Sequence, residues 1–446
     1  MRPLEIVLTV LLVVSACSLA FRGLRPWIWL AADVCILAAH LIVEGGHWQM
    51  IPTYVAVVVF AGTLMLRAWP PAGVTTVLLL CVASCGLSAL LPMFRLPAPT
   101  GPYPLGTRIL QIRTDGASGR DVVVQLWYPA SPSHQSFASY RRREETTRSS
   151  SYQAVLPTNS RLNAPVASGM FPVLLFSPAW GGRRTQNTYL VEDLASHGFV
   201  VAAIDHPGNS GPTLYEDGHV GQPATGDAMD FATLSLEEIK GHGARELERQ
   251  TTDEIGVLSA LAHMNHNAGD PLYQRLDLNR VGALGHSFGG AVAAEAALKD
   301  ERIKAALDLD GSLFGQVQRE GLPKPFMFIT EPVYAAPPEP SAADLINDAL
   351  NASDLEAIKK FGAYRIFLHG STHESFTDHS LFSPLTRLSG AGTIPKNREC
   401  EIVRAYALAF FDKTLRGADP QLLRNLSGLY PEATLEVIPP AVARQA

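Results

Sequence analysis

The most constraining feature of this sequence is the segment at residues 281–290, VGALGHSFGG. An apolar run typical of a buried strand leads straight into the pentapeptide GHSFG, and an alanine-rich stretch typical of a helix follows at 291–299. The glycines two residues before and after the serine are needed because a side chain there would collide with the neighbouring strand or helix. The segment predicts a tight strand-to-helix turn with Ser287 at its apex. The other residues of this turn are Gly285, His286, Phe288 and Gly289.

The N-terminal fifth of the chain is dominated by four apolar stretches, at residues 4–21, 27–43, 50–66 and 72–94. A helix needs about 17–25 residues to cross the hydrocarbon core of a bilayer, and each stretch is near that length. The four stretches therefore predict that residues 1–95 form a membrane segment with about four transmembrane helices. The alternative is that the first stretch is a cleaved signal, since residues 14–17, VSAC, resemble a lipoprotein cleavage site. The further spans that follow favour an anchor.

Two ionisable residues interrupt the second span, Asp33 and His40. They are seven residues apart and therefore project from one helical face. Intramembrane ionisable groups are either functional or serve as polar contacts inside a helix bundle, and we favour the second interpretation here.

Basic residues near the spans indicate how the segment is oriented in the membrane. Arg22, Arg25 and Arg67 fall on one side and Arg2 and Arg95 on the other. The excess on the first side favours both termini, and the large soluble region, outside the cytoplasm.

Charge and cysteine content narrow the choice of partners. The net charge is −6 without a long basic run, which argues against nucleic acid. Four of the five cysteines lie inside the apolar spans and leave Cys400 alone in the soluble part, so no disulfide framework is possible there.

After a Pro- and Gly-rich linker with a first strand region at 96–120, apolar strands alternate with helical patterns through residues 121–446. This order predicts an α/β fold with a mostly parallel central sheet flanked by helices, and ligands at the carboxyl ends of the strands. We expect strands at 122–128, 173–177, 200–205, 281–285, 305–309, 326–330 and 365–368, and helices at 186–197, 234–266, 291–299, 342–361 and 398–416. Two polar or Pro-rich stretches, 131–169 and 333–341, are interpreted as surface loops or, alternatively, as a lid.

A serine hydroxyl needs a base to become a nucleophile, and the base needs an acid that orients it. Sheet hydrolases of this kind supply them in the order Ser, Asp, His. Asp310 follows the strand at 305–309 and is our candidate acid. Its rival, Asp308, lies on the same face of the strand but deeper in the sheet.

The candidate base is His373, which lies in the loop after the last predicted strand, where a turn can bring its imidazole to Ser287. His369, at the end of that strand, is interpreted as structural. His379 lies further along the same loop and remains an alternative.

The tetrahedral intermediate of ester hydrolysis needs N–H donors for its oxyanion. Phe288 N is one candidate. The second should come from the loop at residues 177–182, SPAWGG, where Pro178 has no N–H. Ala179 or Trp180 must therefore supply it, and we favour Trp180. The neighbouring Arg183 and Arg184 are interpreted as surface arginines or, alternatively, as phosphate contacts.

These residues resemble the platelet-activating factor acetylhydrolases of the plasma and intracellular type II class. GHSFGG matches the nucleophile motif of that family, LDG at 309–311 its acid segment, and GSTHESFTD at 370–378 its histidine loop. The resemblance covers roughly residues 100–416. It implies an α/β-hydrolase fold with Ser287 as nucleophile, Asp310 as acid, His373 as base and Trp180 and Phe288 as oxyanion donors.

By this resemblance the chain cleaves short or oxidised sn-2 acyl chains from phospholipids without a metal or other cofactor. Two departures weaken the substrate assignment. Pro178-Ala179 replaces the family's His-Gly pair, and Ser312 stands where an aromatic residue is usual. The alternatives are a general short-chain carboxylesterase or polyester hydrolase of the same fold, and a catalytically silent membrane-anchored binding protein. We expect an integral protein of a bacterial plasma (inner) membrane with its catalytic domain outside the cytoplasm.

Overall fold

The computed structural model describes residues 1–19, 25–66, 70–114, 119–224, 233–332, 339–419 and 421–441, which belong to two units. One unit consists of residues 1–95 with two later segments, 139–157 and 381–389, and the other of residues 96–138, 158–380 and 390–446. Some predictions fall outside the described residues. These are Arg22 and Arg67, which were used for the membrane orientation, and most of the Pro-rich stretch 333–341.

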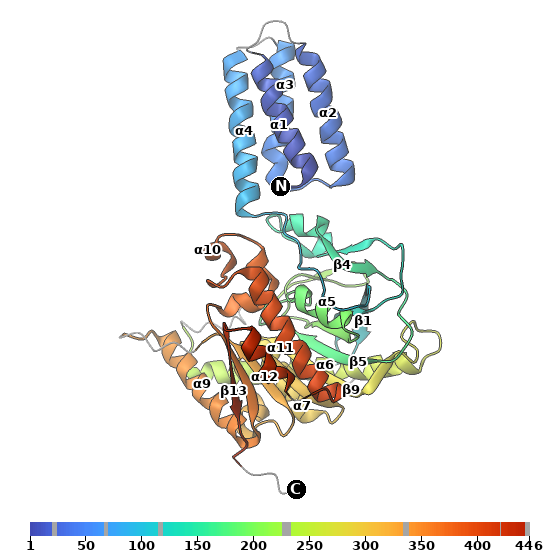
Figure 1. Ribbon diagram of the computed structural model, residues 1–446, viewed down its shortest axis with the longest axis vertical. Helices are drawn as coiled ribbons and strands as arrows, with labels where there is room; N and C mark the ends of the chain where they lie inside the picture. Colours follow the sequence, from blue (N-terminus) through green and yellow to red (C-terminus); the bar gives the residue numbers. More distant parts are fainter. Residues whose placement is uncertain are drawn as a thin grey trace. The chain divides into compact units, whose positions relative to one another are not determined.

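The first unit is a bundle of four helices (Figure 1). They are α1 (Pro3–Ser18), α2 (Pro26–Val43), α3 (Ile51–Leu66) and α4 (Pro70–Leu90), with a short 3-10 turn at Trp48–Met50. By length and composition three helices of the described chain could cross a membrane, Pro26–Val43, Trp48–Leu66 and Pro71–Leu90. Helix α1 is apolar but, at 16 residues, shorter.

Two segments from the middle and the end of the chain pack within this unit. Ser149 O accepts a hydrogen bond of 2.8 Å from Trp48 Nε1, and Ser383 Oγ donates one of 2.6 Å to Leu90 O. The rings of Phe94, Tyr140 and Phe382 pack on one another, with centroids 4.9–6.1 Å apart. The middle of the predicted loop or lid at 131–169 therefore belongs to the helical unit.

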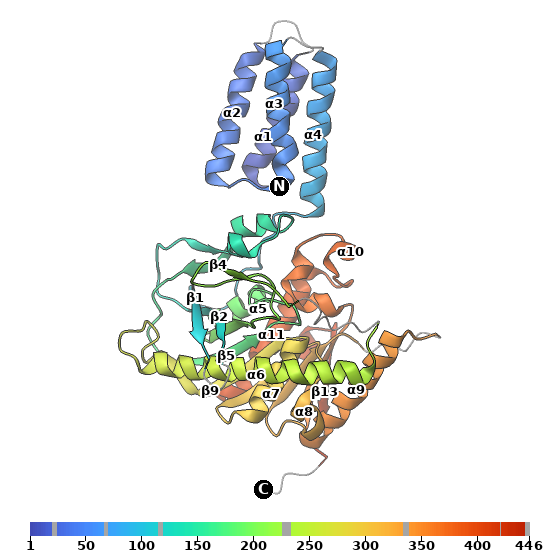
Figure 2. The same ribbon diagram turned by 180° about the vertical axis from the view of Figure 1, so that it is seen from behind.

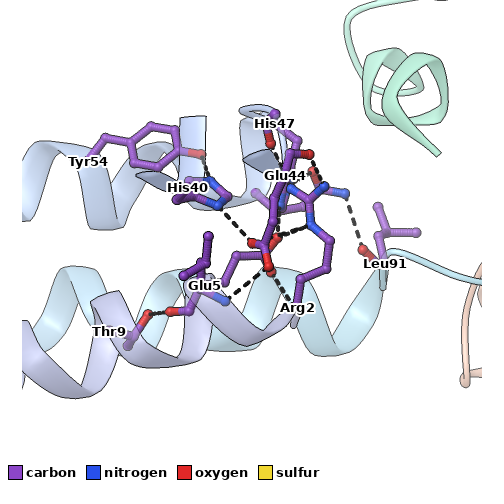
Figure 3. Close-up of polar contacts among 11 residues, drawn as sticks. Arg2, Glu5, Thr9, His40, Glu44, His47, Tyr54 and Leu91 are labelled. Carbon is purple, nitrogen blue, oxygen red and sulfur yellow. Dashed lines mark hydrogen bonds and ion pairs between the residues drawn. The ribbon is translucent and has the colours of Figure 1, made fainter. Parts of the chain in front are cut away.

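A polar cluster closes one end of the bundle (Figure 3). Glu5 Oε1 lies 2.8 Å from His47 Nε2, and Glu44 Oε2 lies 3.0 Å from His40 Nδ1. Donor atoms of Glu5, His40 and Glu44 are all within 4.8 Å of one another, close enough to share a cation. The Arg2 guanidinium already supplies positive charge there, through an ion pair with Glu5 of 2.5 Å.

Asp33 and His40 are both buried, as expected for polar residues that face a bundle interior. They do not form a pair. His40 Nε2 lies 2.7 Å from the hydroxyl of Tyr54, whereas the carboxyl oxygens of Asp33 have no hydrogen-bond partner among the described residues.

The second unit is built on an eleven-stranded sheet in the order β13-β12-β11-β10-β9-β5-β6-β2-β1-β4-β3. The central strands from β6 to β12 are parallel, while β13, β2 and β1 pair antiparallel with their inner neighbours. The strands are β1 (Leu105–Arg113), β2 (Asp121–Pro129), β3 (Phe137–Ser139), β4 (Pro157–Leu162), β5 (Phe171–Ser177), β6 (Val200–Asp205), β9 (Leu276–His286), β10 (Ile303–Leu309), β11 (Phe326–Thr330), β12 (Ala363–Leu368) and β13 (Ala433–Ile438). A separate pair is formed by β7 (Thr213–Leu214) and β8 (Val220–Gly221).

Helices cover both faces of this sheet, which makes the predicted α/β-hydrolase architecture correct (Figures 1 and 2). One face carries α5 (Thr188–Ser196), α11 (Lys396–Arg416) and α12 (Leu422–Leu429). The other carries α6 (Leu236–His266), α7 (Phe288–Lys299) and α8 (Gly315–Glu320), with α9 (Ala342–Phe361) beside α8. The short α10 (Thr386–Ser389) belongs to the helical unit.

Local sequence explains why the elements lie where they do. All seven residues of β5 are buried, as its unbroken apolar run predicts for a strand covered on both faces. Helix α6 begins with a capping box in which Ser235 Oγ accepts from Glu238 N and Glu238 Oε2 accepts from Ser235 N. Helix α5 begins at Thr188 rather than at 186, because the side chains of Gln186 and Asn187 bond to other loops.

Candidate active site

The turn between β9 and α7 has the geometry that its sequence predicts. Ser287 adopts φ 55° and ψ −124°, a conformation that residues other than glycine rarely occupy and that marks strain at functional turns. A Cβ on Gly285 would lie 2.1 Å from Gly289 O, and a Cβ on Gly289 would lie 2.0 Å from Ser177 O. Both contacts are with backbone, which cannot move aside, so these two positions require glycine.

Asp310 is placed as the acid partner of a histidine. Its Oδ2 lies 2.7 Å from His373 Nδ1, and its Oδ1 accepts hydrogen bonds from Thr330 Oγ1 (2.6 Å) and Glu331 N (2.8 Å). Burial alone would raise the pKa of Asp310, but the hydrogen bonds from His373 and Thr330 lower it overall. Both oxygens of Asp310 are therefore engaged in hydrogen bonds that favour its ionised form.

Asp308 makes no contact with His373. It is completely buried, and its Oδ1 accepts from Gly311 N at 2.7 Å. Burial raises the pKa of Asp308 well above its usual range, and its carboxyl group fills the space beside Gly290 that a Cβ there would need. Of the two candidate acids, Asp310 is the one that contacts a candidate base.

His373 lies in a 3-10 turn, and its side chain is 45% exposed. Burial opposes its protonation, but the hydrogen bond and charge of Asp310 raise the pKa of His373 overall. With Nδ1 donating to Asp310, Nε2 is left as the proton acceptor. The two other candidate bases are engaged elsewhere, His369 with Thr434 Oγ1 at 2.9 Å and His379 with Glu374 at 2.7 Å.

His286 links the loop that holds His373 to the turn that holds Ser287. Its Nε2 lies 3.0 Å from His373 O, and the two rings are 4.6 Å apart. Since His286 directly precedes Ser287, this contact holds the loop of His373 beside the serine. Among the described residues Ser287 Oγ makes no hydrogen bond, and in hydrolases the nucleophile–base contact often tightens only when substrate binds.

Gln186 is a site residue that sequence reasoning missed. Its Nε2 lies 3.1 Å from His286 Nδ1, and its Oε1 accepts from Ala179 N at 2.9 Å. Burial, followed by the neighbouring His373, lowers the pKa of His286 to about 3, so its ring is neutral and Nδ1 can accept. Gln186 thus ties the loop before it to the nucleophile turn. No local motif marks such a residue, because its partners are distant in sequence.

The loop at residues 178–182, which we call the oxyanion loop, follows β5. Because Ala179 N is bonded to Gln186, it is not available to a substrate, whereas no hydrogen bond engages Trp180 N in the described part of the chain. The rings of Trp180 and Phe288 are 4.9 Å apart, so the two predicted donor residues are neighbours. The far end of the loop is fixed by Gly181 N, which donates to Asn209 Oδ1 at 2.9 Å.

Of the two arginines after this loop, Arg184 differs from both interpretations of the sequence, whereas Arg183 is partly exposed. Arg184 is 2% exposed and forms an ion pair with Asp205, so it is neither a surface residue nor a phosphate contact. The side chain of Arg183 lies against Gly211, where an added Cβ would meet the guanidinium.

Apolar side chains fill the space on one side of the nucleophile turn. Phe288 packs on Phe314, with ring centroids 5.6 Å apart, and Trp180 packs on the same cluster. Gly243 makes room for Phe314, since a Cβ there would lie 2.6 Å from its ring. The other buried members of this cluster are Ile239, Leu247, Ala291, Val292, Ile346 and Leu350.

The family model and the first curated relatives point to one family, and the solved structure reported below is that of another esterase. Residues 89–421 match the family model of platelet-activating factor acetylhydrolase, isoform II. The chain is 25% identical to the platelet-activating factor acetylhydrolase of Cavia porcellus over 363 residues, 72% of this chain and 78% of that one. It is 27% identical to a probable 1-alkyl-2-acetylglycerophosphocholine esterase of Arthroderma benhamiae, over 58% of this chain and 65% of that one. Among solved structures, a ferulic acid esterase from Streptomyces cinnamoneus matches with TM-score 0.60 and 27% identity, over 77% of this chain and 99% of that one.

Proposed function

The chain belongs to the platelet-activating factor acetylhydrolase isoform II family, and from this premise we propose that it is a membrane-anchored serine esterase that hydrolyses short or oxidised sn-2 acyl chains of phospholipids. As a member of this family it is a carboxylic ester hydrolase. The observation that carries the proposal is the 2.7 Å contact between His373 and Asp310, held by His286 beside the strained turn of Ser287.

In the first half of the reaction Ser287 Oγ attacks the ester carbonyl carbon while His373 Nε2 takes the hydroxyl proton. Asp310 keeps the proton of Nδ1 in place and stabilises the imidazolium that forms. When the tetrahedral intermediate collapses, the imidazolium gives its proton to the departing sn-2 oxygen. A lysophospholipid leaves, and the acyl group stays on Ser287.

In the second half His373 takes a proton from water, which attacks the acyl-enzyme. The carboxylic acid is released, and Ser287 recovers its proton from His373. The N–H groups of Trp180 and Phe288 bind the oxyanion in both tetrahedral intermediates. A single donor of this kind contributes roughly 3–4 kcal/mol to the transition state.

Three observations support a lipid ester with a short acyl chain. Two relatives are named for 2-acetyl phospholipids. The rings of Trp180, Phe288 and Phe314 pack on one another next to Ser287, where we infer that they limit the length of the acyl chain. Apolar helices able to cross a membrane would keep the enzyme at its substrate.

A general short-chain carboxylesterase or polyester hydrolase is the second candidate function. It is favoured by the likeness to a ferulic acid esterase, since the match covers 99% of that structure. Pro178-Ala179 at the start of the oxyanion loop also departs from the family pattern.

For the cellular setting we keep the division into a membrane segment at 1–95, a linker with a first strand at 96–120 and a catalytic domain at 121–446. The proposed location is a bacterial plasma (inner) membrane, with the catalytic domain outside the cytoplasm. The substrate is an ester in or near that bilayer.

Labelling with a fluorophosphonate probe tests this proposal. We expect the probe to modify Ser287, located by peptide mass spectrometry, and to leave Ser287→Ala unlabelled. Competition then separates the candidates. Protection by a 2-acetyl phospholipid supports the lipid esterase, protection only by a feruloyl or p-nitrophenyl ester supports the general esterase, and absence of labelling supports a silent binding protein.

A further inference from the structure

A second, fully buried group of polar side chains lies directly behind the oxyanion loop. It consists of Ser177, His206, Asp253 and Glu254, which we call the loop network. None is more than 1% exposed. Ser177 ends β5, His206 follows β6, and the two acids are neighbours on α6.

The hydrogen atoms of the loop network can be assigned in order, starting from the ion pair between Arg120 and Asp253. Arg120 pairs with Asp253 through both Nε and NH2, so Asp253 is an ionised carboxylate. His206 Nδ1 lies 3.1 Å from Asp253 Oδ2 and must carry the hydrogen between them. With that hydrogen on Nδ1, the uncharged form of His206 presents Nε2 as an acceptor.

Ser177 stands between His206 and Glu254 and has one hydroxyl proton. Its Oγ lies 3.1 Å from His206 Nε2 and 2.6 Å from Glu254 Oε2. If the hydroxyl donates to His206, Glu254 must be protonated and donate to Ser177. If Glu254 is ionised, the hydroxyl donates to Glu254, and His206 Nε2 loses its donor unless the ring takes up a proton.

The surroundings favour a protonated Glu254. Burial raises the pKa of Glu254 to about 8, and the bond with Ser177 lowers it only in part. Its second oxygen, Oε1, has no hydrogen-bond partner among the described residues. The charged and titratable groups around this carboxyl are His206 after β6, Asp253 on α6 and, behind them, Arg120 before β2.

The loop network is joined to both ends of the oxyanion loop. Ser177 immediately precedes that loop, and its carbonyl is the atom that a Cβ on Gly289 would strike. The segment after His206 holds the far end, since Asn209 Oδ1 accepts from Gly181 N (2.9 Å) and Gly211 N donates to Gly182 O (3.1 Å). A shift of Ser177 relative to His206 would therefore move Trp180 N.

We propose that Glu254 is a positioning residue for ester hydrolysis: as a neutral acid it donates to Ser177, completes the bond from Ser177 to His206, and so fixes the oxyanion loop. The inference rests on the proposed function and deepens it, because it names the group that holds the oxyanion donor in place. Loss of the Glu254 proton turns Ser177 away from His206 and loosens the loop.

The test is the pH profile of kcat and KM on p-nitrophenyl butyrate for the full-length protein in detergent. If ionised Glu254 is inactive, the kcat of wild type should fall on the alkaline side as Glu254 loses its proton, and most of the plateau should be lost by pH 9. Glu254→Gln cannot ionise and still donates to Ser177, so we expect it to keep more than half of its plateau at pH 9. Glu254→Leu removes the donor, and its kcat should fall about tenfold at pH 7 with KM changed less than twofold.

Glu192→Gln is the matched control. Glu192 is also fully buried, and burial raises its pKa to about 7, but it bonds to Ser160 and Asn159 away from the oxyanion loop. Its profile should equal that of wild type. Thermal unfolding and fluorophosphonate labelling of Ser287 verify that each variant is folded.

The outcomes separate the two claims. An alkaline limb that persists in Glu254→Gln, or a Glu254→Leu variant with wild-type kcat, overturns the role of Glu254 and leaves the esterase assignment intact. A wild-type protein without Ser287-dependent turnover on any ester refutes the proposed function, and the inference with it.

Discussion

Replacing Asp310 by asparagine should lower kcat strongly, for a reason that follows from the hydrogen bonds of this residue. The Oδ1 position of residue 310 receives two donors, Thr330 Oγ1 and Glu331 N. An asparagine must place its carbonyl oxygen there, which turns its NH2 group toward His373 Nδ1. That nitrogen then has to be the acceptor, so the ring proton moves to Nε2, and His373 can no longer take the proton of Ser287.

The size of the effect follows from the loss of the productive tautomer. In Ser-His-Asp triads this change lowers kcat about 10⁴-fold, or roughly 5.4 kcal/mol at 1.36 kcal/mol per tenfold. We expect the same loss here, measured as initial rates on p-nitrophenyl butyrate. KM should change little, because residue 310 does not contact the acyl chain in this mechanism.

Asp308→Asn is the matched control for Asp310→Asn. Burial raises the pKa of Asp308 well above its usual range, which disfavours a charge there, and an uncharged amide can still accept from Gly311 N. Its kcat should stay within about threefold of wild type. Near-normal activity of Asp310→Asn, or a loss confined to Asp308→Asn, would refute the assignment of the acid.

Three further results are expected. The first is an acidic limb of kcat/KM with its midpoint above pH 6.5, because Asp310 raises the pKa of His373 and an imidazolium cannot act as base. A midpoint below pH 6 would contradict a raised pKa of His373. Gly289→Ala should prevent folding or lower Tm by about 10 °C or more, since its Cβ meets backbone, whereas Gly428→Ala in open space should leave Tm unchanged within a few degrees. Phe314→Ala should raise the rate on p-nitrophenyl octanoate relative to the butyrate by about tenfold, and an unchanged ratio would remove Phe314 from the acyl pocket.

The sequence predicted those parts of the fold whose signals are local. Unbroken apolar runs located β5, β6 and β11 to within two residues, because strands buried on both faces cannot alternate. The glycine pattern around Ser287 predicted a tight turn. In the structure both flanking glycines are required, because a Cβ at either position would collide with backbone atoms. The edge strand β13, in contrast, alternates weakly and depends on pairing with β12 and on packing against α12, so it was missed.

For the candidate site, the sequence located those residues whose order along the chain marks them. Ser287, Asp310 and His373 follow one another at the ends of strands, and the structure joins the last two directly. Gln186 and Glu254 escaped notice, because their roles depend on partners that lie 7–100 residues away in sequence. A buried glutamate on an amphipathic helix has no sequence signature that separates it from a surface one.

The most direct test of the central claim is hydrolysis of a phospholipid series with sn-2 acetyl, butyryl and palmitoyl chains, beside p-nitrophenyl butyrate, by wild type and Ser287→Ala in detergent. The account predicts that wild type releases the acetyl and butyryl chains, spares the palmitoyl chain and loses all turnover on Ser287→Ala. Cleavage of the nitrophenyl ester alone would contradict the phospholipid assignment, and turnover that survives in Ser287→Ala would contradict the nucleophile itself.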